Sequence, residues 1–183
     1  MGRSALAIVR IDGPGSPSIL SSLSGGRSFD VRTSVLTHII NDAGEPLDEC
    51  IAVRYAAPHS FTGNDLVELT LHGNPLLVSR LIDACLAFGA RLAEPGEFTE
   101  RAVLNGKLDL VQAEAIADLI NARTALQAKT SLSNLDGLLS RRATSIRESL
   151  LHVISRLEAA LDFSEEGYEF ITRSEAASRL TAA

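Results

Sequence analysis

The feature that most constrains the fold is a junction at residues 95–120, which read PGEFTERAVLNGKLDLVQAEAIADLI. Pro95-Gly96 predicts a turn into a short helix over residues 97–104. Asn105-Gly106 then predicts the end of that helix, because both residue types tolerate the left-handed conformation in which helices often terminate. One folded unit is therefore expected to finish here.

A second helix is predicted directly after this stop. Asp109 stands at an N-cap position and Gln112 follows three residues later, which is the spacing of a capping box. The new helix is expected to begin at about Leu110. We therefore expect two domains, residues 1–108 and 109–183.

Lys107 lies between the end of one predicted helix and the start of the next. Tight turns on both sides limit where its ammonium group can point. A lysine after a helix is also stabilised by the helix dipole alone, so its position is compatible with a solvated role as well as a binding role.

The first hundred residues combine strand and helix patterns, which predicts an α+β fold with a mixed sheet. Expected strands cover residues 5–11, 33–40, 49–56, 65–72 and 90–93, the second and third of them joined as a hairpin through 41–46. Ser16 is expected to cap a short helix that begins at Pro17, and Asn74 a longer one that begins at Pro75.

Alternation along the strand at 65–72 singles out one carboxylate. Val67, Leu69 and Leu71 share one face, whereas Glu68 and His72 share the other. A carboxylate midway along the second face is either solvated or holds a partner. Glu68 is therefore a candidate binding residue.

Arg10 is the one charged residue in the apolar strand at 5–11, and the Gly-rich turn DGPGSP follows it. Two readings stay open for this arginine. Its long side chain either reaches past the sheet edge to solvent or stands beside the turn to receive an anion.

Beyond Asp109 the pattern is helical throughout. Apolar spacing runs from Leu110 to Leu126, breaks at Gly137 and resumes over residues 146–161, and an acidic turn at 164–167 precedes a last helix over 175–182. This predicts a segment of a helical bundle.

Composition limits the class of protein. No apolar run approaches the roughly 20 residues of a membrane helix, and no signal peptide is recognised, so we expect a cytoplasmic protein. Cys50 and Cys85 are isolated and are expected to be free, buried thiols. A net charge of −6 argues against a broad basic surface for nucleic acid, so any RNA contact is local or made elsewhere.

Four blocks in order resemble the MnmE (TrmE) family of tRNA-modification GTPases: GRSALAIVRIDGP, APHSFTGNDLVELTLHGNP, the junction and EAALDFSEE. The resemblance implies that residues 1–108 form a folate-binding and dimerisation domain, similar in fold to the aminomethyltransferase of glycine cleavage. It also implies that residues 109–183 are part of the helical domain into which the family's GTPase domain is inserted.

The resemblance further implies a cofactor and its contacts. These are 5-formyltetrahydrofolate, or a related reduced folate, and the residues Arg10, Glu68 and Lys107. A folate has a pterin edge of amide and amine groups that a carboxylate can pair with, and an acidic glutamyl tail that a base can meet. One acid and two bases suit such a ligand. Neither a catalytic residue nor a metal ligand is assigned.

The chain also departs from the family's pattern. No GxxxxGKS or GxxxxGKT is present, since Gly106-Lys107 is followed by Leu108. The chain is therefore not expected to hydrolyse GTP, and GTP, magnesium and potassium would belong to a GTPase domain that it lacks. Its sequence opens at GRSA, where family members carry a short strand, so one edge of the sheet is expected to be missing or supplied differently. Milder departures are Asn64, Asn74 and Val103.

We therefore expect the homodimeric N-terminal part of an enzyme that acts with an MnmG-type flavoprotein on tRNA. The family's reaction is the 5-carboxymethylaminomethyl modification of the wobble uridine. One alternative is a stand-alone folate-dependent one-carbon transferase, for which Asp65 and His72 are the only local acid–base candidates. The other is a dimerisation or interaction module without a ligand.

Overall fold

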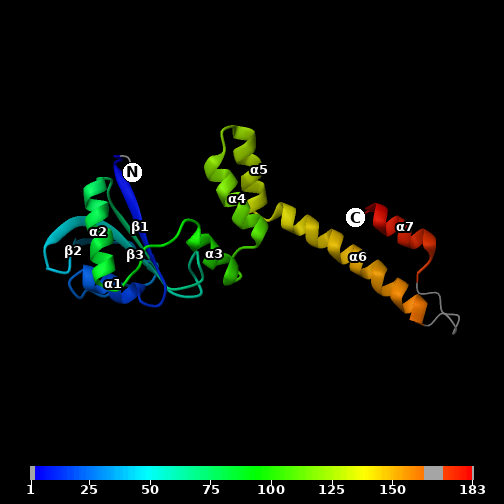
Figure 1. Cartoon of the computed structure of the whole chain (residues 1–183), viewed down its shortest axis with the longest axis horizontal. Coiled ribbons are helices and arrows are strands. Elements are labelled where there is room, and N and C mark those ends of the chain that lie inside the picture. The colour runs from blue at the N-terminus through cyan, green and yellow to red at the C-terminus, as the bar shows by residue number, and fades with distance from the viewer. Residues whose placement is uncertain (1–2, 163–170, 183) are drawn as a thin grey trace. The chain divides into compact units, whose positions relative to one another are not determined.

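The computed structural model describes residues 3–162 and 171–182, and the chain divides into two compact units, Met1–Leu108 and Asp109–Ala183 (Figure 1). The first unit combines a sheet with helices and the second is helical. The predicted α+β fold class is thereby confirmed. The two units are described separately below.

Four strands form the sheet of the first unit: β1 (Leu6–Asp12), β2 (Val35–Ile40), β3 (Pro46–Tyr55) and β4 (Leu66–His72). Their order is β1-β4-β3-β2, and every neighbouring pair is antiparallel. The sheet is thus antiparallel and not mixed. In the described ranges, parallel pairing is limited to an isolated bridge between Val31 and Arg54.

Two helices, α1 (Ser16–Leu23) and α2 (Pro75–Ala87), pack against one face of the sheet (Figure 1). They bury a core in which leucines from the helices meet leucines from β4, because alternate residues of that strand are apolar. Its fully buried members include Leu20, Leu23, Leu69, Leu71 and Leu81.

The start of α1 differs from the expectation. Gly15 is the N-cap and Ser16 is already the first helical residue. The reason is the turn before it: Ser16 N donates to Gly13 O at 3.0 Å, so the chain enters the helix one residue early. At the second helix the expected cap is confirmed, since the Asn74 side chain accepts a hydrogen bond from Leu76 N.

The strand expected at residues 90–93 is wrong, because the structure has no strand there. A strand requires a ladder of backbone hydrogen bonds to a neighbour. The described sheet ends at β1 and β2, and this segment pairs with neither of these edge strands. The segment leads instead into α3 (Glu97–Leu104), which stops at Asn105 as the sequence predicted.

The second unit contains α4 (Leu110–Asn121), α5 (Ala125–Leu135), α6 (Leu138–Asp162) and α7 (Arg173–Ala182). The predicted capping box of Asp109 and Gln112 is confirmed. A second capping box, Thr124 with Gln127, separates α4 from α5 within the apolar spacing that runs to Leu126. Gly137, with a φ of +83°, marks the predicted break before α6. The expected turn at 164–167 lies outside the described residues.

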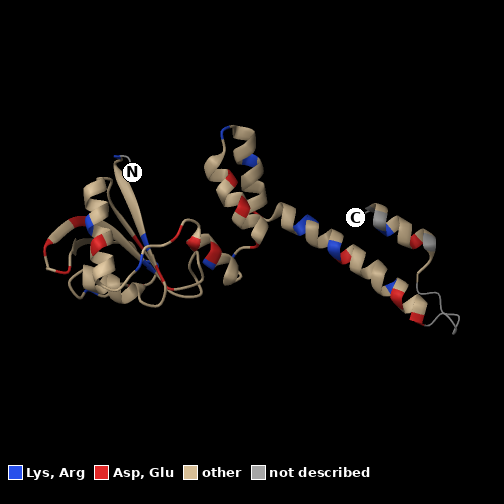
Figure 2. Ribbon diagram, in the orientation of Figure 1, with Lys and Arg blue, Asp and Glu red and all other residues tan. Residues whose placement is uncertain are grey.

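Both cysteines are free and buried, as predicted. Burial raises the pKa of Cys50 to about 12 and that of Cys85 to about 11, so both thiols stay protonated near neutral pH. Within the described ranges, no helix is long and apolar enough to cross a membrane. Basic and acidic side chains are interspersed in each unit, and no described helix is basic throughout (Figure 2).

Candidate functional site

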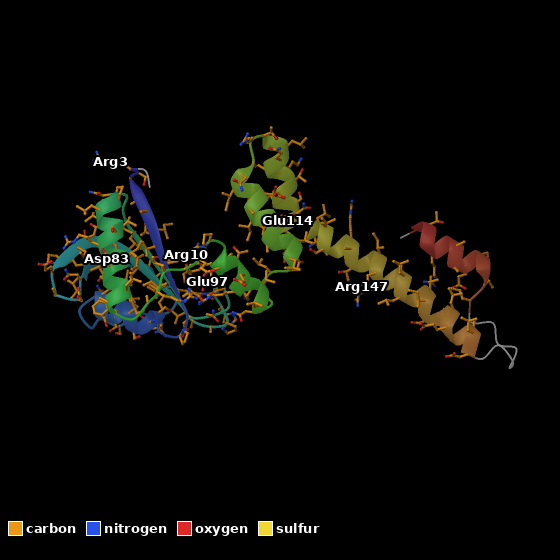
Figure 3. All side chains as sticks on the ribbon, in the orientation of Figure 1. Arg3, Arg10, Asp83, Glu97, Glu114 and Arg147 are labelled. Carbon is orange, nitrogen blue, oxygen red and sulfur yellow. The ribbon has the colours of Figure 1, made fainter. Side chains whose placement is uncertain are left out.

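Two of the three candidate residues form an ion pair. Arg10 on β1 lies directly opposite Glu68 on β4 in the antiparallel register. Arg10 Nε donates to Glu68 Oε1 at 2.8 Å, and the Tyr55 hydroxyl donates to Glu68 Oε2 at 3.3 Å (Figure 3 labels Arg10). Two donors from neighbouring strands therefore hold the Glu68 carboxylate in one orientation.

Glu68 and the third candidate, Lys107, line the same cavity of about 340 Å³. Its walls are Arg32, Tyr55, His59, Ser60, Phe61, Leu66, Glu68 and Lys107. The Arg10 guanidinium lies 5.6 Å from the centroid of the Phe61 ring, a cation–π distance. A cavity of this volume is at the lower end of the range for small-molecule sites.

Lys107 reaches the cavity because the end of α3 turns sharply. Lys107 N donates to Ala102 O at 2.8 Å, and Gly106 before it has a φ of +68°. Its ammonium group donates to Pro58 O at 3.2 Å. The turn that was predicted to limit the lysine thus directs it to the loop of residues 56–65, which we call the cavity loop.

Asn105, at the end of α3, holds the cavity loop through hydrogen bonds. Asn105 Nδ2 donates to Thr62 O at 2.7 Å and to Asn64 Oδ1 at 3.1 Å. Glycine suits position 63, because its φ is +83° and a Cβ there would lie only 3.1 Å from Asn105 Cβ and 3.3 Å from Lys107 Cγ. Helix end and loop therefore form one close-packed support for the lysine.

Asp12, at the end of β1, also holds the cavity loop through hydrogen bonds. Its carboxylate accepts hydrogen bonds from the Thr62 hydroxyl and from Asn64 Nδ2, the latter at 3.0 Å. It also pairs with Arg101 of α3, and its side chain is only 4% exposed. A buried carboxylate is stable when it is paired and hydrogen-bonded in this way.

Arg101 continues the network to Glu97 at the start of α3 (Figure 3 labels Glu97). Glu97 also accepts hydrogen bonds from Arg91 and from Glu94 N. The Arg91 guanidinium, the Glu94 amide and Arg101 together lower the pKa of Glu97 to about 2. The network joins β1, the cavity loop and α3, so it supports the cavity without lining it.

The Glu68 carboxylate keeps capacity for further donors. An ionised carboxylate offers about four lone-pair sites, and the hydrogen bonds from Arg10 and Tyr55 use two of them. Burial and the Glu68 charge raise the pKa of Tyr55, so its hydroxyl stays protonated and continues to donate. Glu68 can therefore receive a pair of N–H donors from a ligand.

The sequence did not single out Arg32, which also lines the cavity. Its side chain donates to His59 O at 3.1 Å and its backbone N–H donates to Arg54 O at 2.7 Å. As one arginine in an irregular polar segment, it carries no local signal of function. Tyr55 and Phe61 were missed as well, although both belong to segments recognised as a strand end and a loop.

A larger cavity of about 510 Å³ lies between β1, α1, α2 and residues 89–93. It is lined by Arg10 but by neither Glu68 nor Lys107. Each of its charged groups already takes part in an ion pair: Arg10, Asp12, Arg91, Glu97 and Arg101. We therefore assign the candidate site to the smaller cavity, where charged groups remain available to a ligand.

The acid–base candidates of the stand-alone transferase lie outside the candidate cavity. Asp65 Oδ1 accepts a hydrogen bond from Ala57 N at 3.0 Å, and His72 Nδ1 lies 2.8 Å from Asp48 Oδ1. The described residues contain no group of His, Cys, Asp and Glu suited to a metal ion. The arrangement suits binding and orienting a ligand.

Two family models match the chain. One, described as "GTP-binding protein TrmE N-terminus", matches residues 1–107, and the other, "MnmE helical domain", matches residues 110–183. The chain is 45% identical over 175 residues to the tRNA modification GTPase MnmE of Aquifex aeolicus, covering 95% of this chain and 39% of that protein.

Two further relatives of the same name come from Aromatoleum aromaticum and Azoarcus. They are 42% and 45% identical over 181 residues, covering 99% of this chain and 40% of each relative. The chain thus spans about 40% of the length of the curated relatives that it matches.

Proposed function

The chain belongs to the MnmE (TrmE) family of tRNA-modification GTPases, and we propose that it supplies the folate-binding and dimerisation functions of such an enzyme. One observation carries the proposal. A cavity in the first unit has an oriented carboxylate, Glu68, in its wall together with the ammonium group of Lys107. A ligand with donors at one end and negative charge at the other matches this polarity.

A reduced folate has both properties. The amide and amine of its pterin edge are adjacent donors, which pair with a carboxylate through two parallel hydrogen bonds. Its glutamyl tail carries carboxylates that an ammonium group attracts. Tyr55 and Phe61 add aromatic surface to the same cavity for the rings between these ends. In this proposal Arg10 acts through Glu68, by holding its carboxylate.

Homodimerisation through the first unit is the second part of the proposal. A straight row crosses the open face of the sheet, because Ile8 is opposite Thr70, Thr70 opposite Ile51, and Ile51 opposite Leu36. The exposed fractions are 62% for Ile8, 44% for Ile51 and 61% for Leu36. Apolar side chains gathered on one face favour burial against another surface, and a second copy of the sheet offers one.

The activity of the complete enzyme extends the proposal. In the complete enzyme, as we propose it, this chain positions a one-carbon donor in the cytoplasm. A GTPase domain and an MnmG-type flavoprotein act with it on the wobble uridine of tRNA. GTP, magnesium and potassium would bind in that GTPase domain. The interspersed charges of the described residues support contact with tRNA through other parts of the assembly (Figure 2).

Titration of the purified chain with 5-formyltetrahydrofolate tests the proposal. We expect saturable binding with one ligand for each chain, and an upward shift of the unfolding temperature, since a ligand stabilises the state that it binds. Absence of both effects at millimolar ligand would leave the chain as a dimerisation module without a ligand.

A further inference from the structure

Two cations line the candidate cavity, and consecutive carbonyl groups hold both of them. Lys107 Nζ donates to Pro58 O at 3.2 Å, and Arg32 Nη2 donates to His59 O at 3.1 Å. A carbonyl oxygen accepts a hydrogen bond but carries no net charge, so it orients a cation without neutralising it. Neither Lys107 nor Arg32 forms an ion pair with any described carboxylate.

Arg10 differs from these two cations. Its Nε is bonded to Glu68, so the two charges of that pair cancel. The cavity therefore keeps two positive charges, from Arg32 and Lys107, on a chain whose net charge is −6. Positive charge concentrated in a cavity of an acidic protein attracts anions to that place.

The backbone of Arg32 is itself unusual. Its φ is +59°, and in the described ranges no other residue apart from glycine has a positive φ. Left-handed backbone is unfavourable for an arginine and persists where surrounding contacts impose it. Here Arg32 N donates to Arg54 O at 2.7 Å, beside the bridge between Val31 and Arg54. From this position the Arg32 guanidinium reaches the cavity loop, where it donates to His59 O.

We propose that Arg32 is a ligand-binding residue, which together with Lys107 receives the end of a ligand that carries two carboxylates. The inference rests on the proposed function: in a reduced folate the two carboxylates are the α- and γ-carboxylates of the glutamyl tail. Glu68 then takes the pterin edge, and the tail points toward Pro58 and His59, whose carbonyl groups orient the two cations.

The assignment separates the roles of the two arginines. Arg10 orients the Glu68 carboxylate, which pairs with the pterin edge. Arg32 instead provides a positive charge for the carboxylates of the glutamyl tail. A guanidinium presents five N–H donors, and the bond to His59 O uses one of them. The remaining donors can pair with a carboxylate in bidentate fashion.

The test compares two ligands on matched variants. The ligands are 5-formyltetrahydrofolate and the primary amide of 5-formyltetrahydropteroate, here called the pteroate, which lacks the glutamyl tail and carries no carboxylate. The variants are Arg32→Gln, Lys107→Gln and the control Arg27→Gln. Arg27 also donates to a carbonyl, Leu36 O at 3.3 Å, and lies 5.6 Å from an aromatic ring, but it does not line the cavity. A second substitution, Arg32→Asn, guards against misfolding because asparagine tolerates left-handed backbone.

We expect Arg32→Gln, Arg32→Asn and Lys107→Gln each to weaken binding of 5-formyltetrahydrofolate about tenfold, the effect of a lost charge-assisted contact that solvent partly screens. Their affinity for the pteroate should match that of the parent chain, and Arg27→Gln should match the parent with both ligands. The loss at Arg32 should shrink as salt is added.

Three outcomes would overturn the inference. In the first, the folded Arg32 variants bind both ligands as the parent does, and in the second they lose both ligands equally. In the third, the parent chain binds folate and pteroate with the same affinity. In each case folate binding itself stands. A parent chain that binds neither ligand refutes the proposed function together with this inference, so the two failures are distinguishable.

Discussion

Arg10 Nε and Glu68 Oε1 lie 2.8 Å apart although the residues are separated by 58 positions in the sequence. The antiparallel pairing of β1 with β4 places them side by side. Neighbouring opposite charges on an exposed sheet face contribute only modestly to stability. The main consequence of this pair is therefore that Arg10 orients the Glu68 carboxylate. The carboxylate is positioned before any ligand arrives.

Glu68→Ala should therefore weaken binding of 5-formyltetrahydrofolate by about 1.5–3 kcal/mol, roughly tenfold to a hundredfold, as for a lost charge-assisted hydrogen bond. The fold should survive, because Glu68 points away from Val67 and Leu69 and water can solvate the partly exposed Arg10. Titration calorimetry measures the affinity, and thermal unfolding checks the fold.

Thr70→Ala is the matched control for Glu68→Ala. Thr70 lies on the same face of the same strand but lines neither cavity, so its loss should leave the affinity unchanged. If the parent chain, Glu68→Ala and Thr70→Ala bind the folate with equal affinity, Glu68 is only a solvated strand residue and does not contact the ligand.

Gly63→Ala should weaken folate binding by disturbing the support of Lys107. The added Cβ would lie 3.1 Å from Asn105 Cβ and 3.3 Å from Lys107 Cγ, and a φ of +83° is unfavourable for alanine. We also expect a loss of stability of about 1 kcal/mol or more from the backbone strain. Affinity and unfolding midpoint are measured on the same sample.

Gly44→Ala separates these two effects. Gly44 has a φ of +78° in the turn between β2 and β3, and nothing lies within 4 Å of an added Cβ. This control should lose stability without losing affinity. If both variants keep full affinity, the packing of the cavity loop against Lys107 has no role in binding.

Acid should destabilise the first unit through Glu97. The pKa of Glu97 falls from 4.5 to about 2 in the folded protein, chiefly because Arg91 donates to it. Between pH 4.5 and about pH 2 the unfolded chain binds more protons than the folded one. The contribution of Glu97 to the free energy of unfolding is therefore complete above pH 4.5 and is lost as the pH falls toward 2.

Denaturant unfolding at pH 7 and pH 3 measures this contribution. Glu97→Gln cannot titrate, so it should be less stable than the parent chain at pH 7 and should approach it at pH 3. An unchanged gap between parent and variant at both pH values would contradict the role given to this carboxylate.

Ile51→Arg should convert the proposed dimer to a monomer, because it places a charge in the centre of the apolar row across the open sheet face. Sedimentation equilibrium measures the change. Leu76→Arg is the control, since Leu76 on α2 is also exposed, at 64% against 44% for Ile51, and lies outside that row. A parent chain that is monomeric at micromolar concentration, or a dimeric Ile51→Arg, would contradict the proposed interface.

Elements with a strong local pattern could be predicted from the sequence. The alternation of Val67, Leu69 and Leu71 with Glu68 depends only on the geometry of one strand. The capping box of Asp109 and Gln112 depends on residues three positions apart. Neither requires knowledge of the rest of the fold.

Features that depend on distant partners could not be predicted in this way. The segment at residues 90–93 has a strand pattern, but it pairs with neither edge of the described sheet. Arg32 reaches the cavity through His59 O, 27 positions away. Its backbone is left-handed, a conformation that the sequence does not reveal at an arginine.

The central claim is that a reduced folate binds in the cavity between Glu68 and Lys107. A crystal structure of the chain saturated with 5-formyltetrahydrofolate tests it most directly. We predict the pterin edge within hydrogen-bond distance of the Glu68 carboxylate and the glutamyl tail beside Lys107. Ligand found in the larger cavity between β1, α1 and α2, or absent from both cavities at saturation, would contradict the claim.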